Sequence, residues 1–482
     1  MANMIGLDFG SHAASIALWY AEKDKVEVIA DDLGFRTIPC AVAFRKGMDD
    51  DKVEILTGPA AVNQAHKNAN NTFLDVRSLL LDESKQMVNV PVLEKEISVT
   101  ELASHFFRNI HNQVKQQVGS AVRDCVVSVP PKLCEDGPAK TRMYEAAQAG
   151  GCRIKSTMDD ASAVLTAHNF DDPKKNPERV VVADMGWSST TISVFDVSGG
   201  MYHPKGSSTC TELGGKVLVD ALVAFCVKDF QRRAKIDCSD YKKSMTMLRK
   251  ECENAMRTLS TGSEAMIDID SLAEGVDYNG KVSKPRFEDM GSIPFIHLKK
   301  AVAGLLESIG VEADSVSQVV MGGGLSGMPK AVSVVKALFP SAVKTNTRGV
   351  DLNEAQATGA ALQASHLVST QLLDKAPAAS ASPNCKTMQS SVVLVSGDAK
   401  QTLFQEGTVV PAHYELKGAV AQADGAFKLE VDGKEVGELA FKADMVGDSE
   451  EITAVVDVDD TGKILVEVKQ TRTGLILTSL TI

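Results

Sequence analysis

Two stretches of this sequence carry the same order of residue types: an apolar run, an aspartate, a glycine and then hydroxyl-bearing side chains. Residues 4–18 place Asp8 in this order, and residues 180–195 place Asp184 in it. A tight turn between two strands directs backbone N–H groups at one point, which suits an anionic oxygen. An aspartate beside such a turn can hold hydrated Mg²⁺. Two copies could clamp one phosphate chain from both sides, so the repeat predicts a two-lobed nucleotide binder.

The residues after each aspartate are the predicted phosphate loops. They are Gly10, Ser11 and His12 in the first loop, and Gly186, Trp187, Ser188 and Ser189 in the second. Asp8 and Asp184 are the predicted metal residues, which would hold Mg²⁺ through water. The sequence leaves the role of His12 open, because its ring could contact phosphate or could fill the space of a smaller side chain.

A third group of polar residues recurs at helical spacing. Glu253, Arg257 and Ser260 stand at positions i, i+4 and i+7 of a helix predicted over residues 243–259, and therefore share one face. A solvated ion pair on an amphipathic helix explains this spacing. A polar wall for a ribose and a base explains it as well, and spacing alone does not decide between the two.

Glycines at two strand-to-helix junctions complete the candidate site. Gly214 and Gly215 precede a predicted helix, and Gly323 and Gly324 follow an apolar strand that begins at residue 319. A strand, a glycine turn and a helix N-terminus form an anion site through backbone N–H groups and the helix dipole. Tight packing of a strand against a helix would require the same glycines, so both interpretations stay open.

The elements that must position these residues alternate between strands and helices. Helices are expected over residues 63–81, 140–149 and 354–373, and strands over 125–129 and 267–272. Thr100 is expected to cap a helix that buries Leu102, Phe106, Ile110 and Val114, which recur every fourth residue. The exposed loop at residues 171–178 is the predicted boundary between the two lobes.

The C-terminal part of the chain has a different composition. Residues 376–391 are rich in alanine and serine and are the predicted linker, which assigns residues 1–375 to the nucleotide-binding domain. Residues 392–482 are predicted to be all β, with Asp432-Gly433 as a hairpin turn. From residue 391 onward the net charge is −8, from 16 acidic and 8 basic side chains, so a basic partner is favoured.

Bulk composition excludes several classes of protein. A net charge of −12 argues against direct binding of nucleic acid through a basic face. Nine scattered cysteines without a Cys-x-x-Cys pair favour a reduced, cytoplasmic setting over a disulfide framework or a zinc site. The sequence shows no basic and apolar leader and no run of eighteen apolar residues, so no membrane association is expected.

Taken in order, these stretches resemble the heat-shock-70 (DnaK-type) family. The likeness covers nearly the whole chain and is strongest in two segments, residues 252–260 (Cys-Glu-Asn-Ala-Met-Arg-Thr-Leu-Ser) and 267–275. It implies an α/β fold: an actin-like bilobal nucleotide-binding domain with duplicated ribonuclease-H-like lobes, followed by a small all-β sandwich. As a departure from the family, no helical lid is expected after the β sandwich. The likeness also implies that the two loops hold phosphates, that the 253–260 face holds adenosine and that Gly323-Gly324 closes the opposite side.

The sequence departs from the family pattern at several of these positions. Ser11 and His12 replace paired threonines, Trp187 and Ser188 replace glycines, Thr191 replaces an acidic residue, Arg77 and Met256 replace lysines, Asn353 replaces an aspartate, and Gly327 replaces an arginine. Residues 158–161 read Met-Asp-Asp-Ala where the family has Asn-Glu-Pro-Thr. Arg77, Asp159, Asp184 and Thr191 are therefore degenerate catalytic positions, and no catalytic residue is predicted. Because phosphoryl transfer depends on positioning, we expect ATP and Mg²⁺ to bind with little or no hydrolysis.

A nucleotide-binding domain followed by a β domain without a helical lid is a shortened form of the family's domain plan. This form resembles the atypical Ssz-type subunit of the ribosome-associated complex. The resemblance implies a stable heterodimer with a zuotin-type J-domain protein, contact with the ribosome mainly through that partner, and assistance to nascent-chain folding. An extended peptide could still add to the β domain. Two alternatives stay open: a shortened but active ATP-hydrolysing chaperone that binds unfolded peptides, and a small-molecule kinase of the same fold with Asp159 or Asp160 as its base.

Overall fold

The computed structural model describes most of the chain. The described residues are 2–20, 25–31, 34–47, 52–119, 122–134, 137–172, 174, 178–345, 350–369, 392–396, 399–404, 412–419, 425–441, 451–458, 463–470 and 476–482. The predicted linker at 376–391 and the turn at 459–462 lie outside these residues, so the predicted domain boundaries stay predictions.

The first lobe is built on a sheet with the strand order β3-β2-β1-β10-β11. Its strands are β1 (Ala2–Phe9), β2 (Ala13–Tyr20), β3 (Lys25–Val28), β10 (Asp124–Val129) and β11 (Arg153–Asp159), with the short β4 (Ile38–Pro39) paired to β2. β1 runs antiparallel to β2 and parallel to β10. The hairpin predicted at residues 4–18 therefore forms the middle of this sheet.

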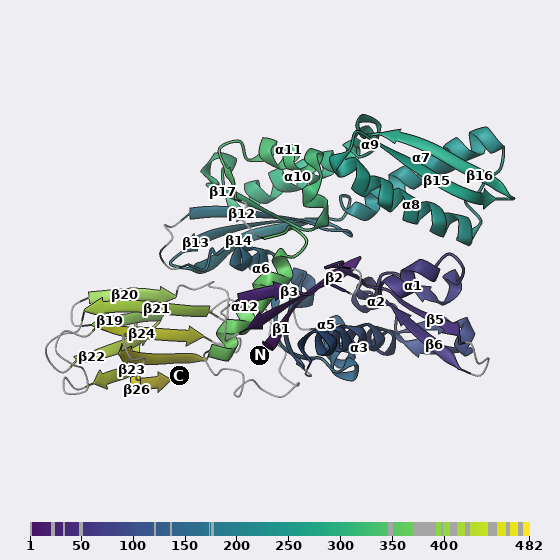
Figure 1. Cartoon of the computed structure of the whole chain (residues 1–482). Coiled ribbons are helices and arrows are strands. Elements are labelled where there is room, and N and C mark those ends of the chain that lie inside the picture. The colour runs from purple at the N-terminus through teal and green to yellow at the C-terminus, as the bar shows by residue number, and fades with distance from the viewer. Residues whose placement is uncertain are drawn as a thin grey trace.

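The second lobe repeats this plan with the order β14-β13-β12-β17-β18. Its strands are β12 (Glu178–Met185), β13 (Thr190–Ser198), β14 (Met201–Cys210), β17 (Gln318–Gly322) and β18 (Val343–Thr345). β12 is antiparallel to β13 and parallel to β17, as β1 is to β2 and β10. The two central hairpins thus occupy equivalent places in two sheets of one topology, and Figure 1 shows the lobes one above the other.

Two helices lie between the sheets and bring them together. Helix α6 (Asp160–Ala167) packs on the second sheet, and α12 (Ala355–Ser369) packs on the first. Glycines permit this approach: a Cβ on Gly359 of α12 would lie 2.8 Å from the Cα of Ala163 in α6. Side chains at this contact would separate the lobes, so the small residues of α12 set how closely the two sheets approach.

Each lobe carries an outer part. In the first lobe it comprises β5 (Val42–Lys46), β6 (Val53–Thr57), β7 (Thr72–Phe73), β8 (Met87–Val90), β9 (Lys95–Ser98), α1 (Pro59–Gln64), α2 (Val76–Leu81), α3 (Val99–Val118), α4 (Pro131–Cys134), α5 (Pro138–Gly150), η1 (Ala69–Asn71) and η2 (Pro91–Leu93). In the second lobe it comprises α7 (Gly215–Ala234), α8 (Lys242–Thr261), β15 (Glu264–Ala273), β16 (Val276–Ser283), α9 (Lys284–Met290), α10 (Ser292–Ile309), η3 (Ala313–Ser315), η4 (Gly324–Gly327) and α11 (Pro329–Leu338). In Figure 1, α7 and α8 of the second lobe lie above α1 and α2 of the first.

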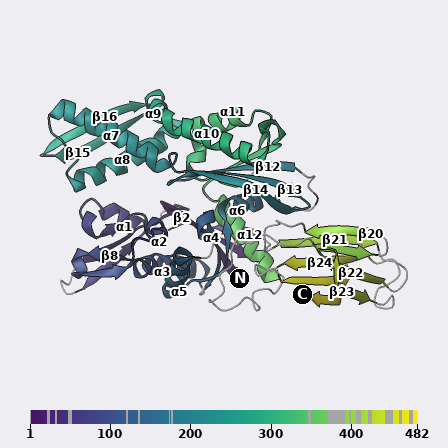
Figure 2. The ribbon, with the colours of Figure 1, turned by 180° about the vertical axis from the view of Figure 1, so that it is seen from behind.

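The C-terminal strands form two four-stranded sheets that share one apolar core. The first sheet has the order β20 (Ala399–Phe404), β19 (Val392–Ser396), β22 (Gly425–Val431) and β23 (Lys434–Phe441), and the second has β21 (Ala412–Ala419), β24 (Glu451–Val458), β25 (Ile464–Gln470) and β26 (Ile476–Thr481). Leu429 of the first sheet and Val466 of the second belong to one buried cluster, against which Met201 of the second lobe packs. These strands lie beside α12 in both views (Figures 1 and 2).

Two local predictions are wrong. Residues 63–81 do not form one helix; the segment contains the end of α1, then η1, β7 and α2. Its asparagines make long-range bonds instead, as Asn68 Nδ2 donates to the carbonyl of Phe44 over 2.7 Å. The cap of α3 is Ser98, whose side chain accepts from the N–H of Glu101, rather than Thr100. The Asp432-Gly433 turn is confirmed, with both residues at positive φ.

No helix among the described residues is both long and apolar enough to cross a membrane.

Candidate functional site

A cavity of about 670 Å³ opens between the two lobes, in the range that holds small-molecule ligands. It gathers most of the residues singled out in the sequence. Those that line it are Asp8, Gly10, Ser11, His12, Arg77, Asp184, Gly186, Trp187, Ser188, Ser189, Thr191, Gly215, Glu253, Arg257, Ser260, Gly323, Gly324 and Asn353. Gly214 and Asp159 are not among its lining residues. Gly214 lies directly below the second loop, where a Cβ would stand 2.9 Å from the N of Ser189.

The two predicted metal residues hold equivalent positions. Asp8 on β1 faces Ser15 across the first hairpin, and Asp184 on β12 faces Thr191 across the second. A third carboxylate, Asp160 at the start of α6, joins them in the cavity. Within the described residues no group of three side chains meets metal-binding geometry, so the three carboxylates do not form a direct coordination shell.

Burial and mutual repulsion raise the pKa values of these carboxylates. The pKa of Asp184 is raised to about 7, mainly by burial and then by the charge of Asp160. The pKa of Asp160 is raised to about 6, again mainly by burial. The pKa of Asp8 is also raised well above its ordinary value, by burial and then by Asp160. Arg77 lowers all three pKa values, since its guanidinium is the nearby positive charge.

Arg77 is held in place by the backbone of the first lobe. Its Nη1 donates to the carbonyl of Phe9 over 3.1 Å, and its Nε is buried without a hydrogen-bond partner. A guanidinium is planar and carries its donors in a fixed fork, unlike an ammonium on a flexible stem. The side chain therefore places fixed charge among the carboxylates with little freedom to follow a reacting group.

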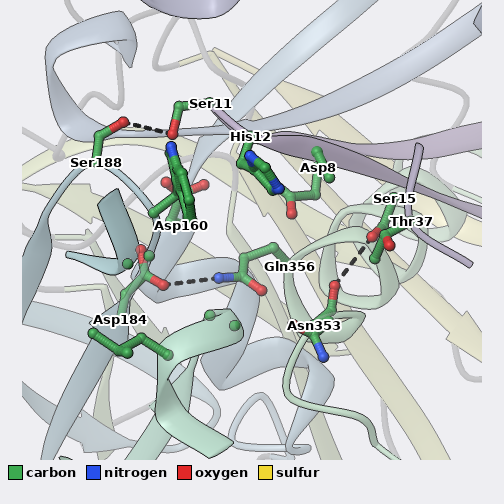
Figure 3. Close-up of a pocket in the computed structure, with 18 of the residues that line it drawn as sticks. Asp8, Ser11, His12, Ser15, Thr37, Asp160, Asp184, Ser188, Asn353 and Gln356 are labelled. Carbon is green, nitrogen blue, oxygen red and sulfur yellow. Dashed lines mark hydrogen bonds between the residues drawn. The ribbon is translucent and has the colours of Figure 1, made fainter. Parts of the chain in front are cut away.

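A side chain from α12 reaches the second aspartate. Gln356 Nε2 donates to Asp184 Oδ1 over 3.0 Å, as Figure 3 shows, and this bond opposes the rise in the pKa of Asp184. Its Oε1 is buried without a hydrogen-bond partner, although the residue lines the cavity. An acceptor of this kind would suit a hydrated cation, because the waters around Mg²⁺ are strong donors.

Asp159 and Asp160 have separate roles at the junction of β11 and α6. Asp159 caps α6, since its Oδ1 accepts from the N–H of Ser162 over 3.0 Å. Asp160 lines the cavity and accepts from the hydroxyl of Ser128 over 2.6 Å. Both carboxylates lie at the entry to α6, Asp159 as its cap and Asp160 as its first residue. The degenerate catalytic position thus caps a helix, and the next residue lines the cavity.

The two loops contact each other across the cavity. Ser188 Oγ donates to Ser11 Oγ over 2.6 Å (Figure 3). The ring of His12 stacks on the indole of Trp187, with centroids 4.1 Å apart and planes inclined by 26°. Burial and the nearby charge of Arg257 lower the pKa of His12 to about 4. His12 is therefore neutral at physiological pH, and its 3.8 Å approach to Glu253 is not an ion pair.

The polar face of α8 turns toward the cavity. Glu253, Arg257 and Ser260 line the cavity, whereas Leu248 and Leu259 are buried in the core of the second lobe. Burial raises the pKa of Glu253, and the neighbouring charge of Arg257 opposes this rise. A partly buried carboxylate and an exposed guanidinium on one wall of the cavity can hydrogen-bond to hydroxyl and amino groups.

The glycines after β17 serve close packing. Gly323 has a φ of 81°, and a Cβ there would lie 2.7 Å from Asp184 Oδ1. The residues from Gly324 form a short 3-10 turn, and α11 begins only at Pro329. Asn353 lies nearby, and its carbonyl accepts from the hydroxyl of Ser15 over 3.1 Å. The backbone of this turn thus approaches the second aspartate directly, a place that a larger residue cannot occupy.

Several residues of the site escaped the sequence reasoning. Gln356, Ser15 and Thr37 line the cavity, and none of them stood out in the sequence. A weak signal existed for Gln356, which is the large polar residue in segment 355–361 of otherwise small residues. Thr191, which stands in place of a carboxylate, shares a hydrogen bond of 3.0 Å with Thr209 of the adjacent strand.

The duplicated sheets, the cavity between them and the paired aspartates define an actin-like nucleotide-binding fold. A model of the Hsp70 protein family matches residues 4–413, so the chain belongs to the Hsp70 family of chaperones. Proteins of this family bind ATP with Mg²⁺, and the carboxylates and the buried Gln356 acceptor fit such a hydrated cation. Asp8 and Asp184 would hold it through water, and it would supply positive charge to the phosphates.

Proteins that are similar to this chain carry names of the same family. Heat shock 70 kDa protein 14 of Xenopus tropicalis is 30% identical over 453 residues, covering 87% of this chain and 85% of the relative. Heat shock 70 kDa protein 2 of Paracoccidioides lutzii is 28% identical over 390 residues, covering 76% of this chain and 58% of the relative. Heat shock cognate 70 kDa protein 3 of Dictyostelium discoideum is 27% identical over 390 residues, covering 75% of this chain and 60% of the relative. The chain thus spans about 60% of the length of the latter two relatives.

Proposed function

We propose that this chain is an atypical Hsp70-like co-chaperone that binds ATP and Mg²⁺ with little or no hydrolysis. In this role it forms a stable heterodimer with a zuotin-type J-domain protein in the cytoplasm, as an Ssz-type subunit of a ribosome-associated complex does. The partner provides the main contact with the ribosome, and the heterodimer assists the folding of nascent chains. The nucleotide acts as a structural ligand that holds the two lobes together.

The observation that carries this proposal is how the side chains at three degenerate catalytic positions near Asp8 and Asp184 are hydrogen-bonded. Asp159 is engaged as the cap of α6, Thr191 is hydrogen-bonded to Thr209, and Arg77 is fixed to the carbonyl of Phe9. None of these groups is placed as a base that could activate water. Phosphoryl transfer depends on positioned groups, and their misplacement costs orders of magnitude in rate. The cavity itself remains large enough for a nucleotide.

Charge supports a basic partner. The C-terminal residues from 391 onward carry a net charge of −8, two thirds of the −12 of the whole chain. Complementary charge steers association and selects partners. A basic protein bound to this chain would also bring the complex to the anionic ribosome, which the chain's own charge disfavours.

The test is a steady-state ATPase and binding assay with purified chain. We expect an ATP analogue to bind at micromolar concentration or tighter and to need Mg²⁺, with turnover at least tenfold below that of an active Hsp70 and no stimulation by a J-domain. Affinity capture from cell extract should recover one stoichiometric J-domain protein together with ribosomes.

Active hydrolysis would favour the alternative. Turnover that a J-domain stimulates, together with release of unfolded peptide upon ATP addition, would identify a shortened but active chaperone and exclude the structural role of the nucleotide. Asp184→Asn is the matched variant for the binding assay, because it removes the negative charge, nearly keeps the size of the side chain and leaves one oxygen that can accept from Gln356. It should weaken the Mg²⁺ dependence of binding.

A further inference from the structure

The outer parts of the two lobes carry a group of exposed lysines that we call the cationic strip: Lys67 of the first lobe, between α1 and η1, and Lys242, Lys243 and Lys250 of α8. Two hydrogen bonds cross from α8 to the first lobe at this place. Lys242 Nζ donates to Asn70 Oδ1 over 2.9 Å, and Lys250 Nζ donates to Asn63 Oδ1 over 3.4 Å. Figures 1 and 2 both show α8 above α1, so the strip passes from one lobe to the other.

The charge of the strip is not neutralised by carboxylates. Within the part of the chain that the structure describes, none of its four lysines forms an ion pair. The first lobe offers no acid here, because residues 55–74 contain neither aspartate nor glutamate. On α8, Glu251 accepts from Nδ2 of Asn254 over 3.4 Å instead of pairing with the adjacent Lys250. The lysine Nζ groups therefore keep donors for a negatively charged ligand.

The ring of His66 shows that these charges form one positive region. Burial lowers the pKa of His66, and the charges of Lys67, Lys250 and Lys243 lower it further. A hydrogen bond with the backbone of Asn63 opposes this shift. Because the three lysines come from both lobes and act on a single ring, they lie close enough together for one ligand to contact them.

The spacing of the lysines fits a short stretch of polypeptide. Lys243 and Lys250 are two helical turns apart and share one face of α8, about 10 Å from each other along the helix. An extended segment advances about 3.3 Å per residue, so roughly four residues cover this length. A segment that contains several aspartates or glutamates can therefore reach both lysines and Lys67 at the same time.

A long polyanion fits the strip less well than a short acidic segment. The whole chain has a net charge of −12, so a long nucleic acid would meet repulsion where it extends beyond the strip. Nucleic-acid single strands also bind to rows of aromatic rings, whereas residues 241–261 contain one aromatic side chain, Tyr241. A short acidic segment confines its negative charge to the lysines.

We propose that the cationic strip is a docking site for an exposed acidic segment of a partner protein, which it contacts from both lobes. The β domain lies on the opposite side of the molecule in Figure 1 and, by its own charge, suits a basic partner. Opposite charges at the two sides select different partners, because like charges repel the wrong one. Docking at the strip requires no bound nucleotide, so it goes beyond the proposed function and does not depend on it.

The first experiment measures binding of a fluorescein-labelled peptide, in which glutamates alternate with serines, to the purified full chain. By fluorescence anisotropy in about 50 mM salt, we expect a dissociation constant of about 10 to 100 micromolar. Binding should weaken at least fivefold at about 300 mM salt, because salt shortens the range of charge attraction. A peptide with glutamine in place of glutamate should not bind. If the acidic peptide does not bind either, the proposal is overturned.

Paired charge reversals locate the binding on the chain. Lys243→Glu, Lys250→Glu should weaken binding of the acidic peptide at least tenfold, since attraction is replaced by repulsion. Lys299→Glu, Lys300→Glu is the matched control, because it changes the net charge equally at two exposed lysines of α10, and it should stay within twofold of wild type. Equal weakening in the two paired variants would show attraction to the overall charge alone and would overturn the strip as a site.

A cross-linking experiment tests contact with both lobes. A carbodiimide joins carboxylates of the bound peptide to lysine amines as amides, with loss of water. Mass spectrometry should find the peptide linked to Lys67 of the first lobe as well as to Lys250 of the second. Links confined to α8 would overturn docking across both lobes.

A single strand of twelve uridines tests the other class of polyanion. At the same salt concentration it should bind more weakly than the acidic peptide. Binding as tight as that of the peptide or tighter, lost in Lys243→Glu, Lys250→Glu, would assign the strip to nucleic acid and overturn docking of an acidic protein segment.

Discussion

The two central hairpins of this protein share a backbone plan and differ in how their aspartates are held. In both sheets the aspartate lies on the middle strand, opposite a hydroxyl residue on one side and beside a parallel strand on the other. The charges of Asp160 and Arg77 shift the pKa values of both aspartates, and Asp184 in addition receives a hydrogen bond from Gln356. Duplication has thus kept the positions of the aspartates, while single residues contributed by α6 and α12 set the electrostatics around them.

Glycines at a sheet–helix contact in each lobe, Gly6 on β1 and Gly322 on β17, give the largest expected difference. A Cβ on Gly6 would stand 2.7 Å from the Cα of Ala361 in α12, whereas a Cβ on Gly322 would stand 2.8 Å from a methyl group of Val164 in α6. Backbone cannot yield as a side-chain methyl can, so Gly6→Ala should cost about 3 kcal/mol of unfolding free energy and Gly322→Ala about 1 kcal/mol. Denaturant unfolding measures both values.

A matched control for this comparison exists in α10. Gly304 is an exposed helical position at which a Cβ meets nothing within 4 Å, so Gly304→Ala should be neutral or stabilising by up to about 1 kcal/mol. Equal costs for Gly6→Ala and Gly322→Ala would show that the two sheets approach their helices in the same way, contrary to the structure.

The raised pKa values of Asp160 and Asp184 predict how stability depends on pH. The unfolded chain loses these protons near the ordinary value of 3.8, whereas the folded protein keeps them until about 6 and 7. The folded state therefore binds more protons between about pH 4 and pH 7, and the free energy of unfolding should fall as the pH rises through this window. Unfolding followed at pH 5 and pH 8 measures the loss, and Mg²⁺ should restore part of it at pH 8.

Replacement of Asp160, the third carboxylate, provides a second test of this pH dependence. Asp160→Asn should lower the pKa values of both Asp8 and Asp184, flatten the pH profile and raise the stability at pH 8 by about 1 to 2 kcal/mol. Asp159→Asn is the control, because asparagine caps a helix as well as aspartate does and the residue does not line the cavity. A steeper pH profile in Asp160→Asn would contradict the repulsion described above.

The smallest effect concerns the amide that distinguishes the second hairpin. Gln356→Leu removes the donor to Asp184, so the pKa of Asp184 should rise further and that of Asp8 should hardly change. At pH 8 the variant should lose about 1 kcal/mol of stability, because an ionised carboxylate has lost a hydrogen bond. At pH 5, where Asp184 is protonated, the loss should be smaller. Carboxyl resonances followed by NMR distinguish the two aspartates.

Features that depend on residues close together in the sequence could be predicted from it. The hairpins around Asp8 and Asp184 and the polar face of α8 follow from period and composition, and the structure places them accordingly. The broken segment at 63–81 could not be predicted, because its asparagines bond to distant backbone, as Asn71 does to the N–H of Val92. Long-range hydrogen bonds of this kind have no local signature.

The residues of the candidate site could also be predicted only in part. Which of two adjacent aspartates lines the cavity depends on the rotation of α6, and that rotation is fixed by the cap at Asp159 and by packing against the second sheet. Gln356 reaches Asp184 only because α12, far along the chain, lies between the lobes. Distances between such segments follow from tertiary structure, so spacing within the sequence carries no record of them.

The position of α12 also constrains how this protein can be made. Ala360 and Ala364 of α12 pack on Met4 and Val126, and Ala357 and Ala361 pack on Ala17. This helix therefore covers the innermost face of the first sheet, and it is synthesised last among the elements of both lobes. During translation, this apolar face stays uncovered until more than two hundred further residues have been synthesised. The N-terminal lobe is therefore expected to mature only late in synthesis, and premature termination before α12 should yield an aggregation-prone fragment instead of a half-sized domain.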